Sequence, residues 1–197
     1  MIDIFLRAKH WHLFLIKVIL PLVLQFAALI AVFMRLWINR EGDPMIAIGY
    51  LKMVPVLALF FSAISFGWYW SIAIGLQDRL PPTVKMNVRK FKVFFFIPVV
   101  YMIVIFSAIS IAFDTFFPLT PEGIGWVLIV FAFIFPVHLF CVFCIFYCLY
   151  FVAKTVKTAE LQREVGFSEF STEFFLIWLF PVGVWFVQPR INRMANG

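Results

Sequence analysis

The feature that most constrains this chain is a series of long apolar runs. Four of them reach the roughly 20 residues that a helix needs to cross a bilayer; they cover residues 13–36, 55–76, 93–113 and 124–153. Of the 197 residues, 64% are hydrophobic and 13% are charged, and a soluble domain of this length cannot hide so much apolar surface from water. The sequence therefore predicts an all-α integral membrane helical bundle that forms a single transmembrane domain, residues 1–197.

A fifth apolar run, residues 174–187, is shorter and contains Pro181 and Gly183. Its length suits a re-entrant or interfacial segment better than a full crossing. The sequence predicts four transmembrane helices followed by such a segment, with a fifth C-terminal helix as the alternative. The two arrangements place Arg190 and Arg193 on opposite sides of the membrane.

A basic segment between the second and third runs sets the predicted orientation. Residues 77–92 carry one acid and five cationic side chains, which are Arg79, Lys85, Arg89, Lys90 and Lys92. Loops rich in Lys and Arg stay on the cytoplasmic side, where anionic lipid head groups attract them. We therefore expect a multi-pass protein of the cell (inner) membrane with a cytoplasmic N-terminus. The position of these charges beside apolar runs indicates a lipid bilayer, and not nucleic acid, as their partner.

Small residues recur at intervals of four in the second run, at Gly67, Ser71 and Gly75. On a helix they share one face and form a groove that another backbone can approach closely. We expect these residues to serve helix packing, and the alternative is chance in a span that tolerates small side chains.

Polar side chains within the spans suggest a second kind of site. Apart from thiols, His138 is the one ionisable side chain well inside the central part of a span, and such residues are functional hypotheses in membranes. Residues of other spans could complete a polar path or pocket with it; they are Gln25, Ser62, Ser65, Tyr69, Ser107, Ser110 and Asp114. The alternative is ordinary hydrogen bonding between helices.

His138 also begins a row of potential metal ligands, which continues with Cys141, Cys144 and Cys148. This spacing places all four on one helical face. Imidazole and thiolate groups bind soft or borderline metals, and a histidine can ligate haem. However, a buried cysteine often acts as a small hydrophobic residue. We therefore expect packing roles for the thiols and predict no cofactor.

Two acidic pairs with i, i+4 spacing follow the fourth run: Glu160 with Glu164, and Glu169 with Glu173. Paired carboxylates can carry out acid–base chemistry or bind a divalent metal. Because Lys157 and Arg163 lie close by in the sequence, we expect a charged helix face that is solvated or binds a partner.

The ends of the chain carry its most distinctive strings, KHW at Lys9–Trp11 and FFLIWLFPVGVWFVQPRIN at Phe174–Asn192. In these strings the chain resembles small uncharacterised bacterial polytopic membrane proteins. The resemblance implies a multi-pass membrane protein and no particular activity.

The motifs of common soluble enzymes, namely GxxxxGK[ST], HExxH, GxSxG and GxGxxG, do not occur. The sequence therefore favours a non-catalytic structural or accessory subunit of a membrane complex, which associates with itself or with another membrane protein. The alternatives are a small-solute transporter or channel that acts as an oligomer, and a haem- or metal-binding protein that uses His138.

Overall fold

The computed structural model describes residues 2–38, 44–115 and 121–196, with side chains described outside residues 36, 44–53, 110–131 and 196. Within these ranges the secondary structure is helical. Four helices are long and apolar enough to cross a membrane; their candidate spans are His10–Arg35, Val54–Arg79, Val88–Ile109 and Ala132–Leu161. This finding confirms the predicted all-α membrane bundle with four spans.

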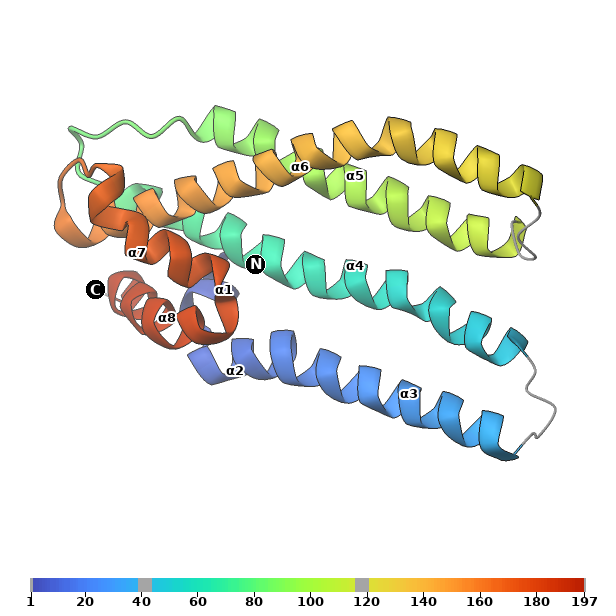
Figure 1. Cartoon of the computed structure of the whole chain (residues 1–197). Helices are drawn as coiled ribbons and strands as arrows, with labels where there is room; N and C mark the ends of the chain where they lie inside the picture. The colour runs from blue at the N-terminus through green and yellow to red at the C-terminus, as the bar shows by residue number, and fades with distance from the viewer. Residues whose placement is uncertain (1, 39–43, 116–120, 197) are drawn as a thin grey trace.

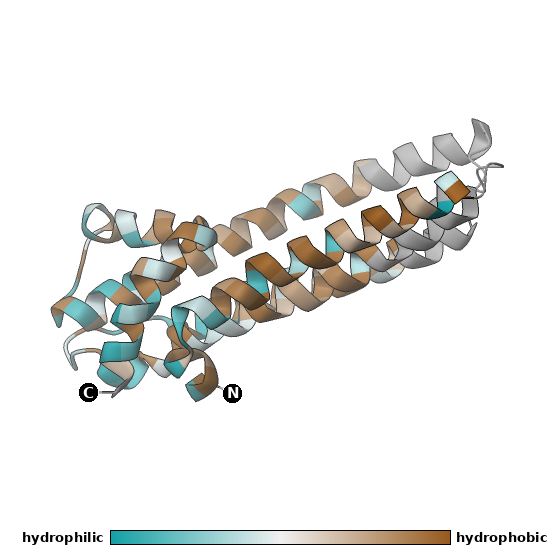
Figure 2. Ribbon diagram, turned by 90° about the horizontal axis from the view of Figure 1, so that it is seen from below, coloured by the Kyte–Doolittle hydropathy of each residue, from teal (hydrophilic) through white to brown (hydrophobic). Residues whose placement is uncertain are grey.

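The long helices run alternately in opposite directions (Figure 1); they are α3 (Leu20–Ile38), α4 (Pro44–Gly75), α5 (Val88–Thr115) and α6 (Pro121–Leu161). The short helix η2 (Gln77–Arg79) follows α4 within the basic segment. The first and last described residues lie at the end of the molecule that carries the basic segment (Figures 1 and 2). We call it the basic end. An even number of crossings accounts for the shared position of the two termini.

The first span is not one regular α-helix. It begins as α2 (His10–Phe14), continues as a π-helical turn, η1 (Leu15–Ile19), and only then becomes α3. Pro21 explains the irregular turn, because proline lacks an N–H and its ring collides with the carbonyl four residues earlier, here that of Lys17. A π-turn widens the helix at this place and relieves the collision.

The C-terminal apolar run forms a helical hairpin, α7 (Phe167–Trp178) and α8 (Phe180–Asn196). Its tip is apolar and uncovered, since Leu179 and Val182 are 55% and 57% exposed. The end of α8 returns to the basic segment, where Arg79 donates a hydrogen bond of 3.4 Å to the carbonyl of Ala195. The hairpin therefore enters and leaves at the basic end, which supports the predicted re-entrant segment over a fifth crossing.

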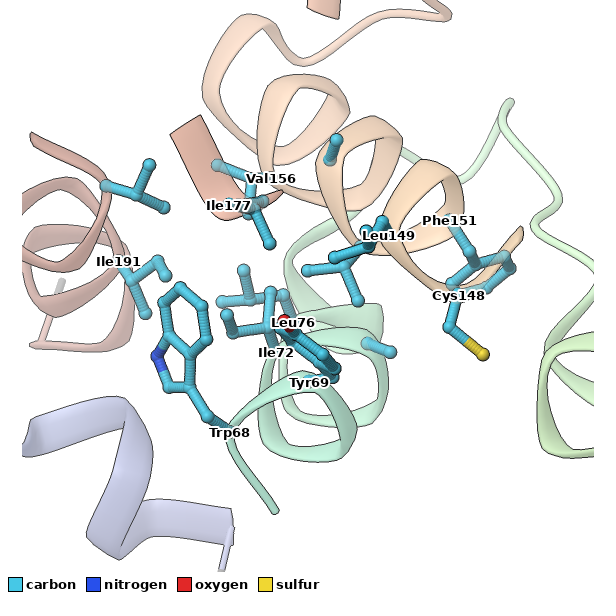
Figure 3. Packing of buried hydrophobic residues seen from close by; sticks show 14 of the residues in the cluster. Trp68, Tyr69, Ile72, Leu76, Cys148, Leu149, Phe151, Val156, Ile177 and Ile191 are labelled. Atoms are coloured by element: carbon cyan, nitrogen blue, oxygen red, sulfur yellow. The ribbon is translucent and has the colours of Figure 1, made fainter. Parts of the chain in front are cut away.

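The buried hydrophobic core lies near the basic end and joins α4, α6, α7 and α8 (Figure 3). At its centre are Trp68, Ile72, Leu76, Leu149, Ile177 and Ile191. Farther along the long helices, large apolar side chains are uncovered; Phe33 and Phe133 are 64% and 77% exposed. Figure 2 shows the same division, with hydrophilic residues gathered at the basic end and hydrophobic ones along the spans. Lipid can cover these side chains at no cost in apolar burial.

The small residues of α4 lie against the N-terminal helix α1 (Ile2–Arg7). A Cβ added to Gly67 would lie 2.9 Å from the ring of Phe5, and one added to Gly75 would lie 2.6 Å from Cγ2 of Ile2. Ser71 is 1% exposed, and its hydroxyl donates to the carbonyl of Gly67. The groove thus receives the apolar face of α1.

The two helices of the C-terminal hairpin approach each other closely at Gly183. A Cβ added there would overlap the backbone carbonyl oxygen of Leu176, whereas one added to Gly166 would meet only the hydroxyl of Ser168 at 4.0 Å. Backbone atoms cannot move aside as the end of a flexible side chain can, so position 183 requires glycine.

We expect Gly183→Ala to lower the free energy of unfolding by about 1–3 kcal/mol, because α7 and α8 must separate to admit the methyl group. Thermal unfolding in mild detergent, followed by tryptophan fluorescence, measures this loss. Gly166→Ala is the control and should unfold within a few degrees of the unsubstituted protein. Equal stability of the two variants would contradict the close approach of the helices.

Candidate functional site

Four charged side chains from three helices meet at the basic end. Glu173 of α7 accepts hydrogen bonds through Oε1 from Arg190 of α8 at 2.8 Å and from Lys157 of α6 at 3.2 Å. Glu160 of α6 binds the same two cations, at 3.2 Å and 3.3 Å. Two positive and two negative charges therefore form a closed network, and this network fastens the hairpin to α6.

Glu173 is the buried centre of this network, with a side chain that is 3% exposed. Burial alone would raise the pKa of Glu173, but the hydrogen bonds from Arg190 and Lys157 hold the pKa below its ordinary value. Its second oxygen, Oε2, is buried and has no hydrogen-bond partner among the described residues. The carboxylate is thus ionised and fixed in place by two cations.

The interpretation of the acidic pairs as one solvated or partner-binding face is wrong for Glu173. The structure pairs Glu173 with Glu160 across two helices, through shared cations, and leaves Glu164 74% exposed beside Lys154. Glu169 instead caps the start of α7, where it accepts a hydrogen bond of 3.0 Å from the N–H of Gly166. Spacing along one helix could not reveal a partner that comes from another.

A second network surrounds the side-chain amide of Gln188, which is fully buried in α8. Its oxygen accepts a hydrogen bond of 2.8 Å from the indole of Trp68. Its nitrogen donates to the carbonyls of Phe5 and Ala8, at 2.9 Å and 3.0 Å, and Asn192 donates to Ala8 at 3.2 Å. The carbonyl of Phe5 lies in the last turn of α1 and that of Ala8 directly follows the helix, where carbonyls lack a partner within the helix. The i, i+4 spacing of Gln188 and Asn192 was the signal that could have indicated this polar face.

Lys17 of the π-turn points into an aromatic enclosure within the candidate span. Its ammonium lies 3.5 Å from the ring centroid of Phe180 and 5.6 Å and 5.9 Å from those of Tyr69 and Trp68. Aromatic faces attract cations, most strongly where water is excluded. The sequence did not indicate this contact, because the rings come from α4 and from the tip of the distant hairpin.

His138 meets one polar partner, the hydroxyl of Tyr101 on α5, which lies 3.2 Å from Nδ1. The two residues line a cavity of about 350 Å³ between α5 and α6. A larger cavity of about 730 Å³ shares Tyr101 and Cys141 with it and extends to Lys92. The surface between these helices is therefore hollowed and almost entirely apolar.

The residues of the hypothetical polar path lie in several places. Gln25 and Ser107 are exposed, Ser62 and Ser65 are half-buried, and Tyr69 is buried; the hydroxyl of Ser65 donates to its own helix at Phe61. The side chains of Ser110 and Asp114 lie outside the described residues. Of the described path residues, none hydrogen-bonds to His138, whose partner is Tyr101.

The three thiols are less exposed than His138, although Cys141 lines the same cavity as the histidine. Cys141, Cys144 and Cys148 are buried, and His138 is exposed. In the described part of the chain, no three His, Cys, Asp or Glu side chains are grouped in a way that could hold a metal ion. Cys148 belongs to the hydrophobic core (Figure 3).

The cations of the basic segment have different surroundings. Lys90 lies over the rings of Phe94 and Tyr147, and Lys92 lies 5.9 Å from the ring centroid of Trp70. Gln162, at the end of α6, donates a hydrogen bond of 2.8 Å to the carbonyl of Arg79. The segment is thus attached to α6 and α8, while Lys85 and Arg89 are exposed.

Comparisons with models of protein families, with curated protein sequences and with solved structures found no match to this chain.

The depressed pKa of Glu173 predicts a loss of stability in acid. A carboxylate whose pKa is lower in the folded state stabilises the fold fully above its unfolded pKa and loses this contribution as the pH falls through its folded pKa. In detergent, the unfolding temperature should therefore decrease as the pH is lowered below about 4.5.

Glu173→Gln should lower the free energy of unfolding at pH 7 by about 1–3 kcal/mol, and its unfolding temperature should depend less on pH in the acidic window. Glu164→Gln is the control, because its exposed ion pair contributes about 0–1 kcal/mol. An unchanged pH profile in Glu173→Gln would contradict the assigned role of the network.

Proposed function

We propose that this protein is a non-catalytic subunit of a membrane complex and that it binds its partner along the first span. The observation that carries the proposal is Gln25, a polar side chain exposed in the middle of that span. Only 6% of the residues in the most apolar stretch of the span are buried. A transmembrane helix so weakly covered by its own chain has most of its surface available to another protein.

The position of Gln25 suits contact with a partner helix. It lines a cavity of about 170 Å³ between α3 and α4, together with Pro21, Leu57 and Phe61. None of the described residues forms a hydrogen bond with its amide. In hydrocarbon an amide without a partner is costly, and a hydrogen bond between helices contributes about 1–2 kcal/mol. A polar group on a second transmembrane helix would satisfy it.

The rest of the fold supports such a role. The two polar networks and the hydrophobic core fasten α1, α4, α6 and the hairpin together at the basic end. The first span extends from this base with little cover of its own. A rigid base and an uncovered helix are what a subunit needs to position itself against a larger assembly.

We further propose that the basic end faces the cytoplasm. The basic segment, Arg190, Arg193 and the start of the chain all lie there. The positive-inside rule favours this orientation, and the cell membrane is the bilayer that we propose.

Gln25→Leu should weaken assembly about tenfold, the factor that corresponds to the loss of one hydrogen bond between helices. The protein is purified from native membrane in mild detergent, and stoichiometric partners, including a second copy, are quantified by native mass spectrometry. Ser107→Ala removes an exposed polar group from another span and is the matched control. If Gln25→Leu keeps every partner, the interface is elsewhere; if the unsubstituted protein is a lone monomer, the proposed function is wrong.

A reporter fused after Gly197 tests the orientation. We expect a green fluorescent protein to be fluorescent there and an alkaline phosphatase to be inactive, since both results require a cytoplasmic C-terminus. Active phosphatase at this position would place the basic end on the opposite side of the membrane.

A further inference from the structure

We infer that the groove between α5 and α6 binds an anionic glycerophospholipid from the leaflet at the basic end, with the head group at Lys92 and one acyl chain along α5. The inference concerns a surface formed by α5 and α6, so its test does not depend on the partner proposed for the first span.

The groove is large and faces away from the core. Its cavity of about 730 Å³ is formed by Phe96, Val100 and Val104 of α5 with Val137 and Cys141 of α6. Phe96, Val100 and Val104 are 51%, 56% and 61% exposed. The two helices lie side by side along this length (Figure 1). The hollow is open and almost entirely apolar, so an acyl chain of the surrounding bilayer can lie in it.

The polar end of the groove carries positive charge. Lys92 lines the cavity, and Arg89 lies one turn earlier on α5, where both side chains are exposed. Neither cation forms an ion pair with a carboxylate in the part of the chain that the structure describes. The ammonium of Lys92 lies 5.9 Å from the ring centroid of Trp70, and tryptophan favours the depth of the lipid head groups. A phosphate at that depth would complement both charges.

The length of the groove matches one leaflet. From Lys92 to Val104 a helix rises about 18 Å, and half of the roughly 30 Å hydrocarbon core is about 15 Å. At the deep end the hydroxyl of Tyr101 is paired with His138, so the groove presents little unsatisfied polarity to a chain. A cationic entrance followed by an apolar channel of leaflet length is complementary to an anionic phospholipid.

The test places the full chain in nanodiscs that contain phosphatidylglycerol and phosphatidylethanolamine. Native mass spectrometry then counts the lipids that remain bound to the protein after its release from the nanodisc. We expect one phosphatidylglycerol per chain to be retained preferentially. Lys92→Gln should reduce this preference about fivefold, because one cation near the surface is lost. Lys85→Gln is the matched control, because Lys85 is an exposed cation of the same basic segment outside the groove. This variant should keep the preference for phosphatidylglycerol.

Val100→Trp tests whether an acyl chain binds in the groove, since an indole at this exposed position fills the groove without disturbing the core. It should abolish retention, while its circular dichroism and unfolding temperature stay those of the unsubstituted protein. Three results would overturn the inference: no preference for phosphatidylglycerol in the unsubstituted protein, equal losses in Lys85→Gln and Lys92→Gln, or full retention in Val100→Trp.

Discussion

The buried amide of Gln188 is the interaction on which the arrangement of the basic end depends. It joins the last helix to the carbonyls that end α1 and to the indole of Trp68 on α4. Away from water, carbonyls at a helix end are costly unless a donor reaches them. Because α8 supplies that donor, α1 can lie in the groove of α4 beneath Gly67 and Gly75.

The charged network performs the corresponding task on the other side of the hairpin. Glu173 would be unstable in the ionised form at its buried position without Arg190 and Lys157. These contacts fix the hairpin against α6. Its apolar tip at Leu179 then lies beside the first span, where Phe180 contacts Lys17. The hairpin is therefore held by directional polar bonds at the end where water and lipid head groups lie.

This division leaves the transmembrane surface available for binding. The core and both networks are concentrated at the basic end, whereas α3 and the groove between α5 and α6 have little cover from the chain itself. Both proposals concern this surface, the first through Gln25 and the second through Lys92. They assign different faces to a protein and to a lipid.

Much of the fold could be predicted from the sequence, because the length of an apolar run determines whether it can cross a bilayer. The four candidate spans follow from this constraint, and so does the prediction that the shorter C-terminal run does not cross. The partners of Glu173 and Lys17 could not be predicted, since periodicity places a residue on a face of its own helix and says nothing of the helix opposite. The row that runs from His138 to Cys148 shares one face of α6, yet its histidine is exposed and its thiols are buried. A common face did not make a common site, because the neighbouring helices cover only part of it.

The bond from Gln188 to Phe5 has a consequence for biogenesis. It joins residues that are 183 positions apart in the sequence. In a chain that enters the membrane during translation, α1 is synthesised before the four long helices and α8 after them, so α1 must wait for α8. Until then the carbonyls at the end of α1 depend on water or head groups for hydrogen bonds. Closure of the basic end thus follows synthesis of the four candidate spans, and it requires a chain that has been extended through α8.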